Sequence, residues 1–333
     1  MDLEEFLAEW HNDSPMLLVH TSGSTGKPKP MLVEKRRMEA SARITCQFLG
    51  LKKGDMALLC MPLDYIAGKM MVVRSLVWSL HLMCLEPSSH PFGASKHPEC
   101  NVPIDFAAMV PMQVWNSLQV PEERECLKNI RHLIIGGGAI NDELAEALKG
   151  FPNQVWSTYG MTETLSHIAL RRLNGPERSD WYTPFEGVDV SLNEENCLVI
   201  NAPAVHDGPL VTNDIAELST LHSPLSTKQF RILGRKDNVI CSGGIKIQAE
   251  EVERLLRPRL CEPYIITKAP DSRFGERVVL LTESHDLDAV RQCCQEVLPK
   301  YWQPRQYLHA PRIPMTETGK PARAEAERLA MDL

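Results

Sequence analysis

Several features that define other classes of protein are missing from this 333-residue chain. No dense tract of lysine and arginine occurs and the net charge is −7, so neither a nucleic acid nor an anionic membrane surface is favoured as a partner. The longest apolar stretch, Met70 to Leu85, contains Arg74 and His81 and is too short to cross a bilayer. The first residues, MDLEEFLAEW, are acidic and amphipathic, unlike a signal peptide. We therefore expect a cytoplasmic protein without a membrane span.

Metal-binding and disulfide patterns are missing as well. The ten cysteines are scattered, and Cys293 and Cys294 form the only close pair. Because no C-x-x-C spacing occurs, the sequence indicates neither a zinc site nor a disulfide framework. We expect mostly buried, reduced thiols. With 43% hydrophobic residues the chain can form a substantial core, and its length suggests about two domains.

Segments of strand length alternate with helical patterns in the first half of the chain, which indicates an α/β sheet with ligands at the strand ends. The segment 66–80 has an apolar residue every three or four positions, which predicts a helix with one face toward the core. From about Val188 the sequence changes to short strands and turns. Expected strands are Met16–His20, Met56–Cys60, His81–Leu85, Arg131–Ile135 and Gln154–Thr158; expected helices are Val33–Leu49, Ile66–Leu80 and Asn141–Leu148.

The segment HTSGSTGKPKP, residues 20–30, combines residue types that suit phosphate binding. Its glycines allow backbone N–H groups to face an anion, while the hydroxyls and Lys27 add further donors. A Walker A loop needs a glycine five residues before Gly26 and a serine or threonine after the lysine. Thr21 and Pro28 stand there instead, so a P-loop nucleoside triphosphatase is disfavoured. From these residues alone, a mobile surface loop remains the alternative.

Five further motifs follow that loop. They are GGGAI (136–140), STYGMTET (157–164), VTNDIAEL (211–218), FRILGRKDNVICSGGIKIQAEEVE (230–253) and MTETGKPAR (315–323). In order and type they resemble the signature motifs of the adenylate-forming superfamily, which includes acyl-CoA synthetases, aryl-CoA ligases, luciferases and the adenylation domains of peptide synthetases. The resemblance extends from about residue 16 to the end of the chain.

The resemblance implies an α/β fold with two domains. A large N-terminal adenylation domain of α/β sheet layers would cover residues 1–236, with a β-rich subdomain at about 187–233. A small, mobile α+β lid domain would cover residues 237–333 and turn about a hinge at Asp237. Many relatives have a longer segment before the phosphate loop than the 20 residues present here. Because every ATP-contacting motif is nevertheless present, we expect a naturally short ligase. A homodimer is left open.

The same resemblance implies a site for ATP with Mg²⁺. The loop that begins at Thr21 would hold the β- and γ-phosphates, the glycines of GGGAI would lie against the adenine, and Tyr159 would stack on its other side. Asp214 would bind the ribose hydroxyls with help from Arg235. The nucleotide-binding residues so implied are Thr21, Ser22, Gly23, Ser24, Thr25, Gly26, Lys27, Gly137, Gly138, Ala139, Tyr159, Gly160, Asp214 and Arg235.

Four residues receive catalytic roles from the resemblance. Thr162 would hydrogen-bond the α-phosphate, and Glu163 would ligate Mg²⁺, a cation that prefers carboxylate and phosphate oxygens. Lys320 would stabilise charge on the substrate carboxylate and the α-phosphate while an acyl-adenylate forms. Rotation of the lid about Asp237 would then exchange this half-reaction for the transfer of the acyl group to CoA.

Two stretches narrow the substrate. STYGMTETLSHIALRRLNG (157–175) and MPLDYIAGKMMVVRSLVWS (61–79) look most like the o-succinylbenzoate–CoA ligases of menaquinone biosynthesis. The resemblance implies an acid–thiol ligase that converts o-succinylbenzoate to its CoA ester. Gly243 and Gly244 would allow the pantetheine arm of CoA to pass close to the backbone. Another aryl- or acyl-CoA ligase, or an acyl-AMP ligase that loads a carrier protein, is the alternative. A non-catalytic nucleotide-binding remnant is disfavoured by the presence of Lys320, Glu163 and Asp214, because a binding module would not need the distal lysine.

A dicarboxylate substrate needs donors for its second carboxylate. The candidate donors are Lys69, Arg74, Ser166 and His167, with Arg171 as a further candidate. Lys69 and Arg74 also flank the apolar stripe of the helix at 66–80. In the alternative interpretation, their charged ends simply extend to water along the helix surface.

Overall fold

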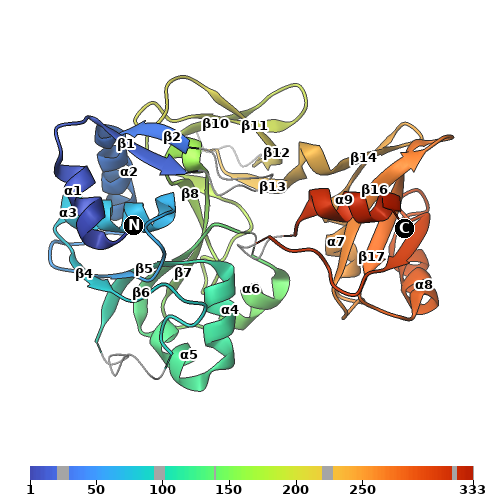
Figure 1. Ribbon diagram of the computed structural model, residues 1–333, viewed down its shortest axis with the longest axis horizontal. Helices are drawn as coiled ribbons and strands as arrows, with labels where there is room; N and C mark the ends of the chain where they lie inside the picture. Colours follow the sequence, from blue (N-terminus) through green and yellow to red (C-terminus); the bar gives the residue numbers. More distant parts are fainter. Residues whose placement is uncertain (21–29, 94–101, 139, 220–227, 317–320, 333) are drawn as a thin grey trace. The chain divides into compact units, whose positions relative to one another are not determined.

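The computed structural model describes residues 1–20, 30–93, 102–138, 140–219, 228–316 and 321–332. The chain divides into two compact units (Figure 1). The N-terminal unit consists of Met1–Ser191, Ile200–Leu210 and Leu218–Arg231, and the C-terminal unit consists of Leu192–Val199, Val211–Glu217 and Ile232–Leu333. No helix in the described residues is long and apolar enough to cross a membrane.

A seven-stranded sheet forms the centre of the N-terminal unit. Its first five strands run parallel, and the last two continue antiparallel. Strands of a parallel sheet are covered on both faces and are therefore almost continuously apolar, as the burial of β6 shows. In sheet order the strands are β4 (His81–Cys84), β3 (Met56–Leu59), β5 (Ile104–Met109), β6 (Ile130–Ile135), β7 (Gln154–Gly160), β8 (His167–Arg172) and β9 (Thr183–Pro184).

Helices cover the two faces of this sheet (Figure 1). Alternate residues of a strand point to opposite faces. Ala107 and Met109 of β5 lie in one apolar cluster with α4 (Pro111–Gln119), α5 (Pro121–Lys128) and α6 (Asp142–Leu148). Phe106 points the other way, toward Arg74 of α3 (Ile66–Trp78), which packs against α2 (Lys35–Phe48). The predicted α/β class is confirmed.

Helix α3 is more deeply buried than its apolar stripe predicts. All residues from 68 to 75 are buried, so the helix is enclosed on every side in its middle. Lys69 and Arg74 are each only 2% exposed. The alternative in which these two side chains extend to water is therefore wrong.

The start of the chain adds α1 (Leu3–His11) and a two-stranded antiparallel sheet of β1 (Met16–His20) and β2 (Pro30–Glu34). Val33 and Glu34 were expected in a helix, but they belong to β2, opposite Leu17 and Met16. A four-stranded sheet follows later in the chain, in the order β10 (Asp189–Leu192), β11 (Cys197–Asn201), β12 (Leu210–Leu218) and β13 (Phe230–Arg235).

The C-terminal unit has its own five-stranded sheet and apolar core. Its path runs β15 (Ile245–Gln248), β14 (Val239–Ser242), β17 (Gly275–Thr282) and β16 (Tyr264–Asp271), and β18 (Gln306–His309) pairs with β17. The helices of this unit are α7 (Ala249–Leu256), α8 (Leu287–Val297) and α9 (Arg323–Asp332).

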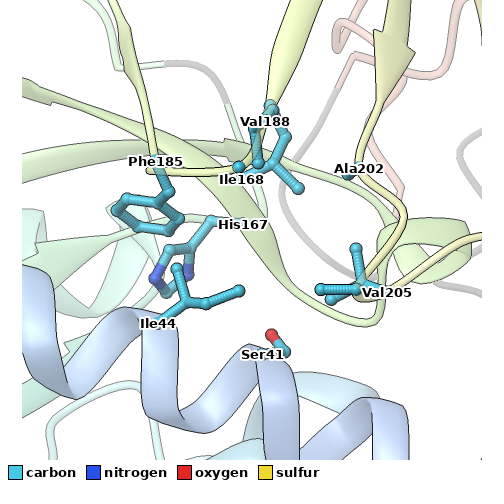
Figure 2. A pocket seen from close by; sticks show the side chains of 10 residues that line it. Ser41, Ile44, His167, Ile168, Phe185, Val188, Ala202 and Val205 are labelled. Atoms are coloured by element: carbon cyan, nitrogen blue, oxygen red, sulfur yellow. The ribbon is translucent and has the colours of Figure 1, made fainter.

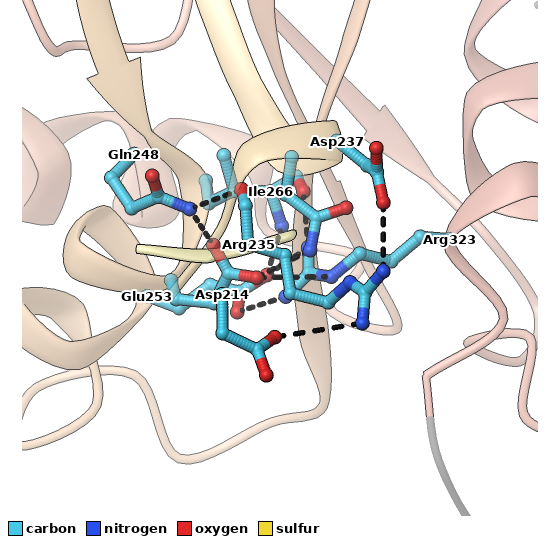
Figure 3. A network of polar contacts seen from close by, with 9 residues as sticks. Asp214, Arg235, Asp237, Gln248, Glu253, Ile266 and Arg323 are labelled. Atoms are coloured by element: carbon cyan, nitrogen blue, oxygen red, sulfur yellow. Dashed lines mark hydrogen bonds and ion pairs between the residues drawn. The ribbon is translucent and has the colours of Figure 1, made fainter. Parts of the chain in front are cut away.

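An ion pair connects α9 to the rest of the C-terminal unit (Figure 3). Nη2 of Arg323 lies 2.8 Å from Oε2 of Glu253 on α7, and Nη1 donates to the backbone oxygen of Ile266 at 3.1 Å. Oε1 of Glu253 also accepts a bond from the backbone N–H of Ile266 at 2.9 Å. Burial raises the pKa of Glu253 even though the charge of Arg323 acts in the opposite direction. The carboxylate therefore depends on these bonds.

We expect Arg323→Met to destabilise the protein by about 3 kcal/mol, because it leaves a buried carboxylate without its cation. Urea-induced unfolding would measure the loss. Arg328→Met is the matched control on the same helix, because Arg328 pairs with Glu325 at the surface. The Arg328 side chain is 60% exposed and that of Glu325 is 45% exposed. The effect of this substitution should stay below about 1 kcal/mol. Equal effects of the two substitutions would contradict the role of the Glu253 pair.

Candidate active site

The GGGAI and YGMTE segments lie side by side because β6 and β7 are parallel and end at the same edge. Ile135 is the register partner of Ser157. The backbone N–H of Gly136 donates to Met109 at 3.0 Å, and a Cβ on this glycine would lie 2.3 Å from the hydroxyl of Thr158. The close approach of the two strands thus requires a glycine. Gly137 and Gly138, predicted to contact adenine, follow directly.

Tyr159 of β7 belongs to a cluster of three aromatic rings. Its ring centroid lies 5.0 Å from that of Phe230 and 5.8 Å from that of Tyr182. The hydroxyl of Tyr182 is in turn 2.8 Å from Oγ of Ser157. These contacts fix one side of the Tyr159 ring, which suits a residue that stacks on a nucleobase.

A tight turn leads from β7 to β8. A Cβ on Gly160 would lie 2.2 Å from the backbone oxygen of Ser166, so no other residue fits here. The Thr164 hydroxyl donates to that same oxygen at 2.7 Å and holds the turn closed. Within the turn, a 3₁₀ segment (Thr162–Thr164) buries Thr162 and exposes Glu163. The exposed carboxylate can reach a bound cation, while the buried threonine lies against the protein.

Arg74 reaches this turn from α3. Its Nη2 donates to Oγ of Ser166 at 2.6 Å, and its Cζ lies 5.9 Å from the centre of the Phe106 ring. Its Nε is buried and has no hydrogen-bond partner in the part of the chain that the structure describes. No described carboxylate pairs with it either. Burial lowers the pKa of Arg74 to about 10, so the group is still a cation at neutral pH.

Lys69 serves a different neighbourhood. Its Nζ donates to the backbone oxygen of Leu18 in β1 at 3.1 Å and lies 5.6 Å from the centre of the Phe6 ring in α1. Burial lowers the pKa of Lys69. The structure therefore brings Arg74, Ser166 and His167 together but places the amine of Lys69 against the first strand of the chain.

His167 lines a small apolar pocket (Figure 2), and its Nδ1 lies 3.1 Å from Oγ of Ser166. In the figure, its ring lies beside that of Phe185; the two meet edge to face, with centroids 5.5 Å apart and an interplanar angle of 64°. Burial lowers the pKa of His167 well below its usual range, and the charge of Arg74 lowers it further, so the ring is neutral. The pocket is lined by Ser41, Ile44, His167, Ile168, Phe185, Gly187, Val188, Ala202, Ala204 and Val205.

Asp214, Arg235 and Asp237 come together in the C-terminal unit (Figure 3). Arg235 donates through Nη2 to Asp237 at 2.8 Å, and its Nη1 lies 3.5 Å from Oδ1 of Asp214. Burial opposes the charge of Arg235, but the bond to Asp237 and the charge of Asp214 outweigh it and raise its pKa. The predicted ribose ligand, its helper and the predicted hinge residue thus form one charged cluster.

The SGGIK loop joins β14 to β15 through two glycines with positive φ. Gly243 (φ 59°) donates from its backbone to Phe274 at 2.8 Å, and Gly244 has φ 82°. Two cations flank the Phe274 ring: Cζ of Arg305 is 3.8 Å and Cζ of Arg273 is 5.1 Å from its centre. These three side chains could not be identified from the sequence, because no motif marks them.

Three groups of predicted residues lie outside the described part of the chain. They are the phosphate loop (Thr21, Ser22, Gly23, Ser24, Thr25, Gly26 and Lys27), the adenine-binding Ala139, and the catalytic Lys320.

Known proteins resemble the chain in sequence and in fold. The 2-succinylbenzoate–CoA ligase of Bacillus mycoides is 24% identical over an alignment of 351 positions, which covers 98% of this chain and 72% of the relative. That of a Geobacillus species is 25% identical, with 98% and 71% covered. A crystal structure of an acyl-CoA synthetase (AMP-forming)/AMP-acid ligase II-like protein from Dyadobacter fermentans has a TM-score of 0.65 at 31% identity, with 97% and 92% covered.

A further solved structure shares the fold at lower identity. The o-succinylbenzoate CoA synthetase of Bacillus subtilis, in complex with ATP and magnesium ion, has a TM-score of 0.74 at 22% identity and covers 92% of this chain and 69% of its own. The family model described as AMP-binding enzyme matches residues 4–202, more than half of the chain. This protein belongs to the AMP-binding enzyme family.

Proposed function

We propose that this enzyme uses ATP to convert 2-succinylbenzoate to its CoA thioester, through an acyl-adenylate, as a step of menaquinone biosynthesis. The observation that carries the substrate assignment is the buried Arg74 beside the turn after β7. A buried cation without a counter-ion is costly. A substrate with a second carboxylate would supply that counter-ion, and 2-succinylbenzoate has two. Relatives named for this substrate support the same choice.

We assign the second carboxylate to Arg74 rather than to Lys69, whose amine is already bonded to the backbone of β1. The guanidinium presents several N–H groups in one plane and suits a carboxylate in two-point contact. Its unpaired Nε would be one of the donors. The succinyl carboxylate would then remain for activation at the exposed face of the turn, near Glu163.

In the first half-reaction, an oxygen of the succinyl carboxylate attacks the α-phosphorus, the bond to the bridging oxygen breaks, and pyrophosphate leaves. Thr162 and Lys320 would stabilise the added charge, and residues of the phosphate loop would hold the departing phosphates. Mg²⁺ bound with ATP supplies charge neutralisation. It is typically held by one or two carboxylates together with substrate phosphates, and the exposed carboxylate of Glu163 fits that role.

In the second half-reaction, the CoA thiolate attacks the acyl carbon and AMP leaves. We propose that residues 237–333 turn about Asp237 between the two steps, so that the loop of Gly243 and Gly244 replaces Lys320. Arg273 and Arg305 beside that loop suit the phosphates of CoA. A carrier protein offers only one phosphate on its pantetheine arm, so these two cations favour free CoA. The supply of ATP and CoA is consistent with a cytoplasmic location.

A substrate screen tests the proposal. We expect AMP and CoA-ester formation with 2-succinylbenzoate to exceed that with benzoates and fatty acids by at least about 100-fold in kcat/KM, because only the dicarboxylate pairs with a buried cation. Both products would be measured side by side for each acid. Equal turnover of benzoate or a fatty acid would refute the substrate assignment and leave an AMP-forming ligase of other specificity.

Lys320→Ala should separate the two half-reactions. Loss of a cation that stabilises the adenylation transition state should slow pyrophosphate release by about 100-fold or more. Thioester formation from a supplied acyl-adenylate should remain close to that of the unaltered enzyme. Lys300→Ala, which removes an exposed lysine from the same unit, is the control and should change neither rate. Unchanged pyrophosphate release in Lys320→Ala would show that the lysine has no adenylation role.

A further inference from the structure

A line of hydrogen bonds runs from Arg74 through the protein interior to α2. Arg74 donates to Oγ of Ser166 at 2.6 Å, and that oxygen lies 3.1 Å from Nδ1 of His167. The other ring nitrogen, Nε2, lies 3.2 Å from Oγ1 of Thr45. Thr45 donates its own hydroxyl hydrogen to the backbone oxygen of Ser41 at 3.1 Å. Thr45 and His167 are both buried and stand 122 positions apart in the sequence.

The direction of each bond follows from its end points. A threonine hydroxyl has one hydrogen, and that of Thr45 is used on the helix backbone, one turn earlier. With its hydrogen assigned to the helix backbone, Thr45 accepts from Nε2–H of His167. A neutral imidazole has one N–H, so Nδ1 is an acceptor and takes the hydroxyl hydrogen of Ser166. The Ser166 oxygen then has only lone pairs left, and these accept from Arg74. This arrangement satisfies both nitrogens of His167 and the hydroxyls of Ser166 and Thr45, and it leaves Nε of Arg74 without a described partner.

This arrangement holds the guanidinium without neutralising it. Buried arginines are ordinarily fixed by carboxylates, which cancel their charge. Here the fixing group is a serine oxygen whose hydrogen points away, toward His167. The positive charge remains available to a ligand, as does the unpaired Nε.

We propose that Thr45 and His167 are positioning residues that determine specificity for the dicarboxylic acid, because they orient Ser166 as an acceptor and thereby aim Arg74 at the second carboxylate. The inference rests on the proposed function. It adds a residue on α2, and it assigns His167 an effect through Ser166 instead of contact with substrate.

The test compares two acids that differ by one group. Pyrophosphate release is measured with 2-succinylbenzoate and with 4-oxo-4-phenylbutanoate, the same keto acid without the ring carboxylate. Thr45→Val removes the hydroxyl and keeps the shape of the side chain. We expect it to raise KM for the dicarboxylate about tenfold, the effect of one misdirected hydrogen bond to a charged group, and to leave KM for the monocarboxylate within about twofold. The value of kcat should change little with either acid.

Further variants separate positioning from folding. Thr45→Ser retains the hydroxyl and should therefore keep the preference for the dicarboxylate that Thr45→Val loses. His167→Phe keeps a ring against Phe185 but removes both nitrogens, and it should repeat the effect of Thr45→Val. Thr282→Val removes a buried hydroxyl that donates to Pro263 in the C-terminal unit, and it should leave the preference unchanged. Because the readout is a ratio of KM values for two acids, partial loss of folded protein does not alter it.

The outcomes distinguish this inference from the proposed function. Arg74→Met should abolish the preference and sets the maximal effect. If the unaltered enzyme and Arg74→Met behave as expected, but Thr45→Val and His167→Phe raise KM equally for both acids or for neither, the positioning role is overturned and the proposed function stands. If the unaltered enzyme shows no preference for 2-succinylbenzoate, the substrate assignment fails, and this inference fails with it.

Discussion

The turn from β7 to β8 brings the backbone of Gly160 so close to Ser166 and His167 that no side chain fits between the two segments. Much of the candidate site depends on this approach. It folds the chain back within a few residues, so that Thr162 is buried, Glu163 is exposed, and Ser166 faces the interior. The turn thereby sets the catalytic segment on one side and the Arg74 contact on the other. A larger residue at position 160 would separate the strands and disrupt both.

The strands and helices expected in the first half of the chain agree with the structure to within two residues at each end, because apolar periodicity marks these elements. Strand β5 and helices α4 and α5 were not among them. The ends that differ have physical reasons. Val33 and Glu34 were assigned to a helix, but they pair with β1 and therefore belong to a strand. The secondary-structure propensity of single residues does not predict such pairing. Helix α9 was not expected from the sequence. Its residues are good helix formers, yet it has no strong apolar stripe to mark it.

The candidate site could be predicted only where a motif carries it. Arg74, Ser166 and His167 were singled out as donors within the two stretches that carry the resemblance, and the structure brings them together. Thr45 could not be found in this way, since a threonine in mid-helix ordinarily bonds its own backbone and nothing else. Its second contact depends on how α2 packs beside β8, which local sequence does not encode. For the same reason Phe274 and Arg305 were missed: their ring and cation meet only in the folded unit.

The buried Arg74 and the partly buried Arg323 show how the partner of a charge indicates its role. Arg323 lies against Glu253, and the pair raises the pKa of the arginine although burial alone would lower it. Such a cation is already satisfied and fastens α9 in place. Among the described residues, Arg74 contacts a serine oxygen, the sulfur of Met71 and a ring face but no carboxylate, and burial lowers its pKa. A buried guanidinium without a counter-ion lowers the stability of the protein, and binding of a ligand anion offsets that loss. For this reason, substitution of Arg323 should change mainly the free energy of unfolding. Substitution of Arg74 should change mainly the preference for one substrate over another.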